Sequence, residues 1–270
     1  YNARCYRLVV FMSKIKSIVR YPIKGLSGEN LENITLEKNQ VLPGDREFAF
    51  ARSYVTYEEN NPMYLRKTNF LALVREEKLA KLDTKFDPKT RELTINLDNK
   101  VVINEILLKE ENIKKVETFF QNYLNLGIDN KPKLVQGIKI QNNNNLTHSF
   151  SDIPDKAVSI INLNTINELE KNIGKNINPS RFRANFLIDK GNPWEEFNWI
   201  GKKVSVGECV LEVFKRTQRC AATNVNPENA VRDINIPNEI NTHYGHFDLG
   251  VYARVIKTGL VSISDKLYIN

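Results

Sequence analysis

Cys220 is the residue of this sequence with the clearest capacity for chemistry. It directly follows Arg219 within the polar stretch 216–227, where a run of alternating apolar residues ends. A neighbouring guanidinium favours the thiolate, which is the form of cysteine that acts as a nucleophile or binds a soft metal. A lone cysteine after a strand pattern is also commonly a small buried apolar residue. From these residues alone, a reactive thiol and a packed thiol both stay open.

Two basic residues in turns could bind an anion. Lys24 lies between Pro22 and Gly25, and Arg46 follows Gly44 closely. Loops are generally polar, so each cation also has a plain interpretation as a solvated surface charge. Proline and glycine fix the backbone on either side, however, which is also how a binding site holds a cation in place.

A second group of polar residues stands around the predicted strand 186–189. Arg181, Arg183 and Asn185 lie at its entrance, an unusual concentration of donors for a plain strand. Upstream, the strand 157–161 leads directly into a helix that we expect to begin with a capping box at Thr165.

The start of that helix is a further candidate for anion binding. Its free N–H groups, together with Asn162 and Thr165, could hold a phosphate. Capping alone also explains both residues.

The composition narrows the classes of function. The 270 residues, 41% of them hydrophobic, suffice for one large or two ordinary globular domains. The net charge of +7 comes from basic residues spread along the chain, which argues against nucleic-acid binding and favours an anionic small molecule as the partner. No apolar run approaches the roughly 18 residues that span a bilayer. We therefore expect a cytoplasmic protein without a membrane span.

The cysteines and histidines exclude several metal sites. Cys5, Cys209 and Cys220 are too few for a disulfide framework and form no C-x-x-C motif. Cys209 lies on the apolar face of a strand pattern, so we expect it in the core. His243 and His246 lack the glutamate and helical context of H-E-x-x-H, which disfavours zinc.

The elements that must position these residues are mostly strands. Short apolar runs bounded by turn residues predict strands near 15–21, 31–36, 47–51, 79–86, 92–97, 157–161, 186–189, 200–206, 209–214, 251–257 and 260–264. Apolar residues spaced by three and four predict an amphipathic helix over 110–126, and a second helix ends at Gly174. The fold class is therefore α+β and β-rich, with a few packed helices.

The chain divides most naturally into two β-rich domains. Residues 1–11 precede Met12, and we expect them to be a leader or an appended remnant. The glycines, prolines and polar run of 127–150 indicate a surface loop or domain junction. We place an N-terminal domain at 12–130 and a second domain at 131–270, and expect the two to share strands across this soft boundary.

Five separate stretches together resemble one family. They are Tyr21-Pro22-Ile23-Lys24-Gly25, Gly44-Asp45-Arg46-Glu47-Phe48, Arg181-Phe182-Arg183-Ala184-Asn185, Arg219-Cys220-Ala221-Ala222-Thr223-Asn224-Val225-Asn226-Pro227 and Gly250-Val251-Tyr252. In this order the chain resembles the MOSC proteins, named for the C-terminal domain of molybdenum cofactor sulfurase. The likeness includes the β-rich N-terminal domain of the bacterial and mitochondrial amidoxime-reducing proteins. It covers nearly everything from Ile15 to Ile269.

The resemblance implies a MOSC-type β-barrel and a role for each matching residue. Cys220 would be the catalytic thiolate that binds molybdenum of the molybdopterin cofactor. The residues that would surround the pterin and its phosphate are Lys24, Arg46, Arg183, Asn185 and Arg219, with Asn162 and Thr165 as a looser match. The family usually has Asp where this chain has Asn226, which removes a carboxylate there.

The activity that the resemblance implies is a molybdenum-dependent oxidoreduction. The protein would reduce N-hydroxylated or other N–O compounds, without pyridoxal phosphate and with electrons from a separate ferredoxin or flavoprotein. An alternative uses the same thiol, because Cys220 could carry a persulfide or hold the molybdenum cofactor for delivery. A third interpretation is an anion-binding β-barrel without redox activity.

Overall fold

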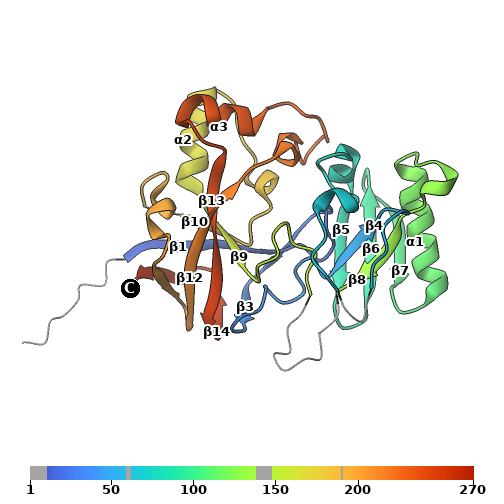
Figure 1. Ribbon diagram of the computed structural model, residues 1–270, viewed down its shortest axis with the longest axis horizontal. Helices are drawn as coiled ribbons and strands as arrows, with labels where there is room; N and C mark the ends of the chain where they lie inside the picture. Colours follow the sequence, from blue (N-terminus) through green and yellow to red (C-terminus); the bar gives the residue numbers. More distant parts are fainter. Residues whose placement is uncertain (1–10, 59–61, 138–147, 190) are drawn as a thin grey trace, which may run out of the picture.

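The protein has two lobes that lie side by side along its longest axis (Figure 1). The computed structural model describes residues 11–58, 62–137, 148–189 and 191–270. The expected leader lies outside these residues except for Phe11, as does the polar run 141–145. We call the two parts the barrel lobe and the small lobe, the latter formed within residues 48–136. Among the described helices, none is both long and apolar enough to cross a membrane.

The barrel lobe is built around a closed barrel of seven strands within the described residues. In order around the barrel these are β10 (Phe186–Asp189), β9 (Val158–Asn162), β13 (Asp248–Lys257), β12 (Cys209–Gln218), β11 (Lys203–Val206), β15 (Lys266–Ile269) and β1 (Phe11–Arg20). The pairing of β1 with β10 closes the ring, and β9 with β10 is its parallel pair. The short β2 (Glu29–Leu31) extends the sheet beyond β1.

Alternation of apolar and polar residues explains how the barrel strands bury one face. Along β12, Cys209, Leu211 and Val213 are buried while the residues between them are partly exposed, as period-two side-chain geometry requires. The predicted core position of Cys209 is confirmed by an exposed fraction of 1%. Trp199 is among the largest side chains that fill the interior.

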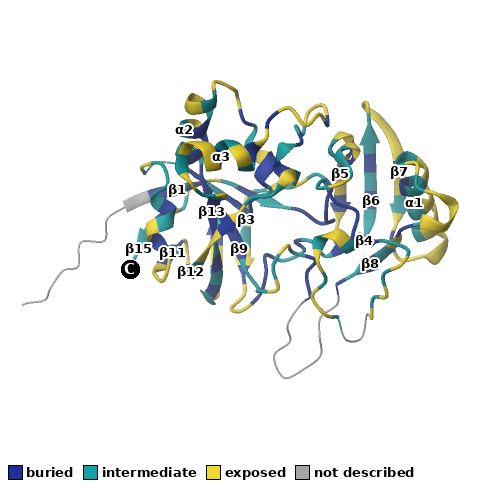
Figure 2. Cartoon of the chain, turned by 45° about the horizontal axis from the view of Figure 1, so that its top comes forward, coloured by how far each residue is buried: buried dark blue, intermediate teal, exposed yellow. Residues whose placement is uncertain are grey.

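Among the described residues, the small lobe contains two small sheets, one α-helix and three short 3₁₀ helices. Its strands are β4 (Phe48–Ala51), paired with β8 (Lys133–Gln136), and the antiparallel series β5 (Asp83–Asp87), β6 (Glu92–Leu97) and β7 (Lys100–Ile106). Helix α1 (Glu110–Tyr123) buries Val116 and Phe120 in the lobe's core and exposes its outer side (Figure 2). The predicted helix is confirmed with a shorter C-terminal end, and the predicted hairpin is confirmed with β6 at its expected bounds. The first hairpin strand begins at Asp83 and not at Leu79, because the preceding residues Glu77–Lys81 form a 3₁₀ helix.

Both ends of the chain contribute to the barrel lobe. β1 pairs with β10 and with β15, and β3 (Asn33–Leu36) pairs with β14 (Gly259–Ser262). The β-rich α+β fold with a barrel of this type is thus as predicted, whereas the division into 12–130 and 131–270 stays a prediction. Strands from before residue 37 lie in sheets with strands from beyond residue 185.

Helices cover one end of the barrel. α2 (Leu163–Ile173) and α3 (Ile236–Tyr244) each end at a left-handed glycine, Gly174 and Gly245. The short 3₁₀ helices are η1 (Lys67–Asn69), η2 (Glu77–Lys81), η3 (Ile128–Asn130), η4 (Pro179–Phe182), η5 (Glu195–Trp199) and η6 (Ala221–Asn224). The sequence did not predict α3, because its region reads as a polar loop.

The predicted capping box at Thr165 is wrong. α2 begins three residues earlier than that box requires, directly after β9, and the side chain of Asn162 caps it by accepting from the N–H of Asn164. Thr165 lies inside the helix, where its hydroxyl bonds to Glu196. The strand leads into the helix without a loop, so the cap falls on the last strand residue.

Candidate functional site

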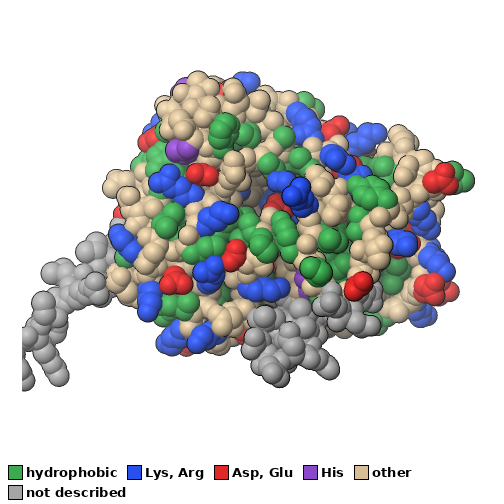
Figure 3. Space-filling view, in the orientation of Figure 1, with side chains coloured by type: hydrophobic (Ala, Val, Ile, Leu, Met, Phe, Trp, Pro, Cys, Tyr) green, Lys and Arg blue, Asp and Glu red, His purple; other side chains and the backbone are tan. Residues whose placement is uncertain are grey.

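A pocket lies between the two lobes, with a volume of about 280 Å³. Its charged lining comprises eight basic residues, Lys24, Arg46, Lys67, Arg181, Arg183, Lys215, Arg216 and Arg219, and two acidic ones, Asp45 and Asp152. Figure 3 shows Lys and Arg side chains spread over this face of both lobes, some of them where the lobes meet. This excess of positive charge suits an anionic ligand.

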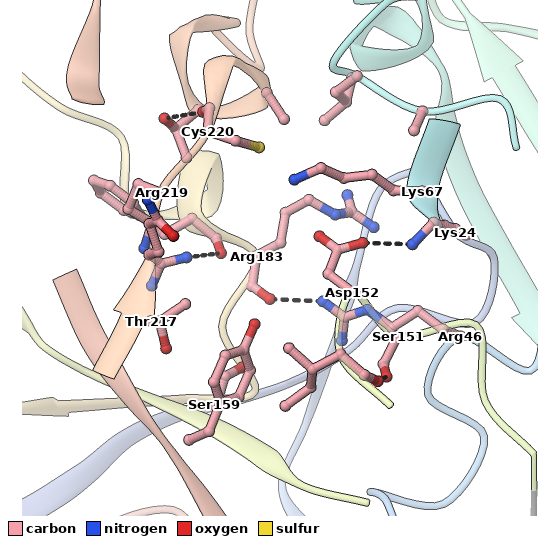
Figure 4. A pocket seen from close by; sticks show the side chains of 18 of the residues that line it. Lys24, Arg46, Lys67, Ser151, Asp152, Ser159, Arg183, Thr217, Arg219 and Cys220 are labelled. Atoms are coloured by element: carbon pink, nitrogen blue, oxygen red, sulfur yellow. Dashed lines mark hydrogen bonds and ion pairs between the residues drawn. The ribbon is translucent and has the colours of Figure 1, made fainter. Parts of the chain in front are cut away.

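Cys220 stands at the edge of this pocket. It follows the end of β12 and immediately precedes η6, and its carbonyl accepts hydrogen bonds from the N–H (3.0 Å) and hydroxyl (2.8 Å) of Thr223. The cysteine is free and only partly buried, in contrast to the core residue Cys209. Figure 4 shows its sulfur directed into the pocket, toward the amino group of Lys67.

Arg219 is held rigidly behind the thiol. Its Nε donates to the carbonyl of Leu249 (2.8 Å), and its Nη1 donates to the carbonyl of Phe182 (3.0 Å). Gly250 makes room for this packing, because an added Cβ would lie 2.6 Å from the carbonyl oxygen of Ile160 and 3.2 Å from Nη2 of Arg219. Burial lowers the pKa of Arg219 to about 10, so the group remains a cation at neutral pH.

Arg46 and Arg183 both place their guanidinium groups against the ring of Tyr21. Their guanidinium carbons lie 4.7 Å and 4.2 Å from its centroid, and Nη2 of Arg46 donates to the carbonyl of Arg183 (2.8 Å). Both arginines adopt left-handed backbone conformations, with φ of 48° and 53°. Such conformations cost about 1–3 kcal/mol each and are concentrated at functional sites.

The two arginines differ in their electrostatic surroundings. Burial, together with repulsion from Arg46, lowers the pKa of Arg183 to about 10. Burial would also lower the pKa of Arg46, but its ion pair with Asp45 outweighs that effect and raises it. Arg183 therefore carries the less compensated charge of the two.

Lys24 is paired with the pocket's second acid. Its Nζ donates to the carbonyl of Phe150 (2.9 Å) and to Oδ1 of Asp152 (2.5 Å). Burial lowers the pKa of Lys24, and the carboxylate offsets part of this effect. Burial would raise the pKa of Asp152, but the nearby ammonium of Lys24 outweighs the effect of burial, lowers the pKa and keeps the carboxyl ionised.

Lys67 and Asp152 were missed by the sequence analysis. Lys67 belongs to η1 of the small lobe and reaches the thiol from the wall opposite β12 (Figure 4). Burial would lower its pKa, but a hydrogen bond to Cys220 outweighs that effect and raises it. Neither residue stands in a motif, so only the packing of the lobes shows that they belong to the site.

The other predicted residues differ in their placement. Asn185 lines the pocket, where its side-chain oxygen accepts from the N–H and the hydroxyl of Ser159, both at 3.0 Å. Asn162 and Thr165 are not among the lining residues. Asn226 is absent from the lining too, and its amide donates to Asp233 (2.8 Å). The structure thus brings together six of the eight predicted site residues, Lys24, Arg46, Arg183, Asn185, Arg219 and Cys220.

At the N-terminal turn of α2, the carboxyl group of Glu196 occupies the place where an external anion could bind. The hydroxyl of Thr165 lies 3.1 Å from both carboxyl oxygens of Glu196, which is fully buried. The same hydroxyl accepts from the N–H of Trp194 (2.8 Å). Burial raises the pKa of Glu196 to about 7. These internal contacts explain Thr165 without an external phosphate.

Three buried polar atoms of the pocket residues lack a hydrogen-bond partner among the described residues. They are Nε of Arg181, Nη2 of Arg183 and Oγ1 of Thr217. A buried donor without a partner costs free energy, and a bound ligand can supply the acceptor. Together with the surplus of cations and the thiol of Cys220, these atoms fit a ligand that carries a phosphate and binds a thiolate.

Comparison with known proteins identifies the class to which this arrangement belongs. Residues 145–268 match the family model of the MOSC domain. These residues are therefore a MOSC domain, which is a domain associated with binding of the molybdenum cofactor. No curated protein sequence is similar enough to count as a relative.

Solved structures give only distant likenesses. The YUAD protein from Bacillus subtilis is 11% identical with a TM-score of 0.44, over 96% of this chain and 95% of that one. YiiM from Geobacillus stearothermophilus is 18% identical with a TM-score of 0.34, over 42% of this chain and 53% of that one. YiiM from Escherichia coli is 20% identical with a TM-score of 0.30 over the same shares.

Proposed function

We propose that the protein binds the molybdenum cofactor and reduces N-hydroxylated or other N–O compounds. The observation that carries this proposal is the thiol of Cys220 at the edge of a strongly cationic pocket in a MOSC-domain chain. The bound cofactor would supply the two-electron redox centre, which is the usual division of labour in cofactor enzymes. Reduction of an N-hydroxyl group consumes two electrons and two protons and releases water, with the electrons delivered by a separate donor protein.

The residues of the pocket divide into groups by the roles that we propose for them. Cys220 binds the metal as a thiolate. Arg183 and Arg219 bind the phosphate, because both are cations held by carbonyl groups rather than by carboxylates. Nη2 of Arg183 and the hydroxyl of Thr217 gain the partners that they lack.

Three further residues position the ligand and exclude competing charge. Asn185 holds Ser159 and thereby fixes the floor of the pocket. Arg46 orients Arg183 through its hydrogen bond to that residue's carbonyl, and Lys24 keeps Asp152 ionised and bound. A fourth residue, Lys67, retains its proton and faces the thiol of Cys220.

Metal and pterin analysis tests the proposal directly. The protein is purified from a host that makes the cofactor, molybdenum is measured by elemental analysis, and released oxidised pterin is measured by fluorescence. We expect about one molybdenum per chain and its loss in Cys220→Ser, with retention in the control Cys209→Ala, because Cys209 lies in the core. A wild-type protein with neither molybdenum nor pterin would overturn the proposal.

A second candidate function is a carrier of sulfur or of the cofactor. The amino group of Lys67 at the Cys220 thiol would stabilise a persulfide anion as well as a thiolate. Sulfane sulfur on Cys220, with no turnover of N–O compounds by the loaded protein, would favour this carrier. Turnover that disappears together with molybdenum in Cys220→Ser would favour the oxidoreductase.

A further inference from the structure

Arg232 connects the small lobe to the segment 219–227, which we call the Cys220 loop. Nη1 of Arg232 donates to the carbonyl of Ala221 (2.8 Å), the residue directly after Cys220. Its Nη2 donates to the carbonyl of Leu73 (2.9 Å) and lies 3.2 Å from that of Val74. The two amino groups of one guanidinium therefore bind to both walls of the pocket, since Leu73 and Val74 line the pocket on the side of the small lobe.

The contact between Arg232 and the small lobe includes an ion pair, and it depends on the geometry of the guanidinium group. Oε2 of Glu77 lies 3.3 Å from Nη2 of Arg232, and both side chains are partly exposed, Arg232 by 32% and Glu77 by 43%. Arginine presents several N–H groups in a rigid plane, so it can donate in two divergent directions at once. The single ammonium of a lysine cannot reproduce that fork.

The backbone of Arg232 is fixed from the other side. Asp233, the next residue, pairs with both of its carboxyl oxygens to Nη2 of the buried Arg181, at 2.7 and 2.8 Å. Nη1 of Arg181 donates to the carbonyl of Asn224 (3.0 Å) in the Cys220 loop, and the backbone of Arg232 pairs with Val225. A restraint applied at the Arg232 guanidinium is therefore transmitted to the loop.

We infer that Arg232 is a positioning residue that registers the Cys220 loop against the segment Leu73–Glu77 and so holds the thiol at its place between the lobes. The inference rests on these contacts and not on which ligand the pocket binds. It explains why the thiol and Lys67, which come from different lobes, face each other across the pocket. It also assigns a role to a residue outside the matched motifs.

Thiol labelling measures this positioning. The chain is produced without cofactor, and the rate of alkylation by iodoacetamide is followed for each cysteine by peptide mass analysis. In Arg232→Gln we expect Cys220 to react about tenfold faster than in wild type, since losing charge-assisted hydrogen bonds frees the loop and the gain in access outweighs the few-fold loss of rate expected when the thiol moves away from Lys67. Arg232→Lys should behave like Arg232→Gln, because charge alone does not restore the fork.

Matched variants separate positioning from general destabilisation. Arg75→Gln removes the same charge from an exposed side chain of the small-lobe segment and should leave the Cys220 rate unchanged. Glu77→Gln removes the negative charge of one acceptor and should raise that rate by a smaller factor. The core residue Cys209 should react at its wild-type rate throughout.

Two results would overturn the inference. One is an alkylation rate of Cys220 in Arg232→Lys that equals the wild-type rate, because this would mean that the positive charge alone positions the loop. The other is a parallel rise at Cys209, which would mean global unfolding. Molybdenum content is measured separately, so a protein without the metal leaves this test intact.

Discussion

The inter-lobe pocket and the start of α2 are two places where this chain concentrates buried charge, and they treat it in opposite ways. At α2, the carboxyl of Glu196 meets the hydroxyl of Thr165, and the network is closed within the chain. In the pocket, basic residues far outnumber acids, and buried atoms of Arg183 and Thr217 have no partner among the described residues.

The difference teaches how to tell a structural polar cluster from a binding site. Both places carry shifted pKa values, and both were candidates for phosphate binding on sequence grounds. A shifted pKa therefore does not discriminate between them. The balance of charge and of hydrogen bonds does, because a site built for an external ligand leaves part of its bonding capacity free.

The largest expected effect concerns Glu196 and the pH dependence of stability. Its pKa is raised from 4.5 to about 7 in the folded protein, so its contribution to stability is complete below pH 4.5 and is lost as the pH rises through 7. Glu196→Gln cannot ionise and should avoid this loss, which amounts to about 3 kcal/mol. Urea unfolding of both proteins at pH 4.5 and pH 8 measures the difference.

The comparison between the two proteins removes the effect of other titrating groups. We expect the free energy of unfolding of Glu196→Gln, relative to wild type, to rise between the two pH values. A relative stability that stays constant with pH would mean that Glu196 is already ionised in the folded state. The α2 cluster would then hold an uncompensated charge, and the contrast with the pocket would fail.

The next effect concerns anion affinity in the pocket. Arg183→Gln should weaken binding of inorganic pyrophosphate about tenfold to a hundredfold, since a charge-assisted hydrogen bond contributes about 1.5–3 kcal/mol. Its thermal stability should not fall, because the substitution removes repulsion between Arg183 and Arg46. Calorimetric titration measures affinity, and Thr165→Val at α2 serves as the control that keeps it.

The sequence predicted the parts of the site that have local signatures. Period-two alternation around Cys209 reports the local backbone, and so do the turn residues around Lys24 and Arg46. These features depend on neighbours in the chain, so a single sequence carries them. The placement of Cys220 beside a cluster of cations was expected from the same motifs, whereas its role as a metal ligand stays a prediction.

The parts that could not be predicted depend on long-range packing. Lys67 reaches the thiol only because η1 of the small lobe packs against the barrel lobe, and no motif marks it. Asp152 joins Lys24 across 128 positions of the sequence. Thr165 misled the local analysis because the hydroxyl that could cap a helix bonds instead to Glu196, a residue far downstream.

The smallest expected effect tests whether the small lobe contributes to the chemistry of the thiol. Lys67→Gln should slow alkylation of Cys220 by a few fold at neutral pH, because the substitution removes the positive charge that faces the sulfur and stabilises negative charge on it during attack. Lys81→Gln, at an exposed position of the same lobe, is the control. An unchanged rate in Lys67→Gln would mean that the small lobe lines the pocket without affecting the reactivity of the thiol. A slower rate would show that the thiol is activated from across the interface, so that neither lobe alone holds the complete site.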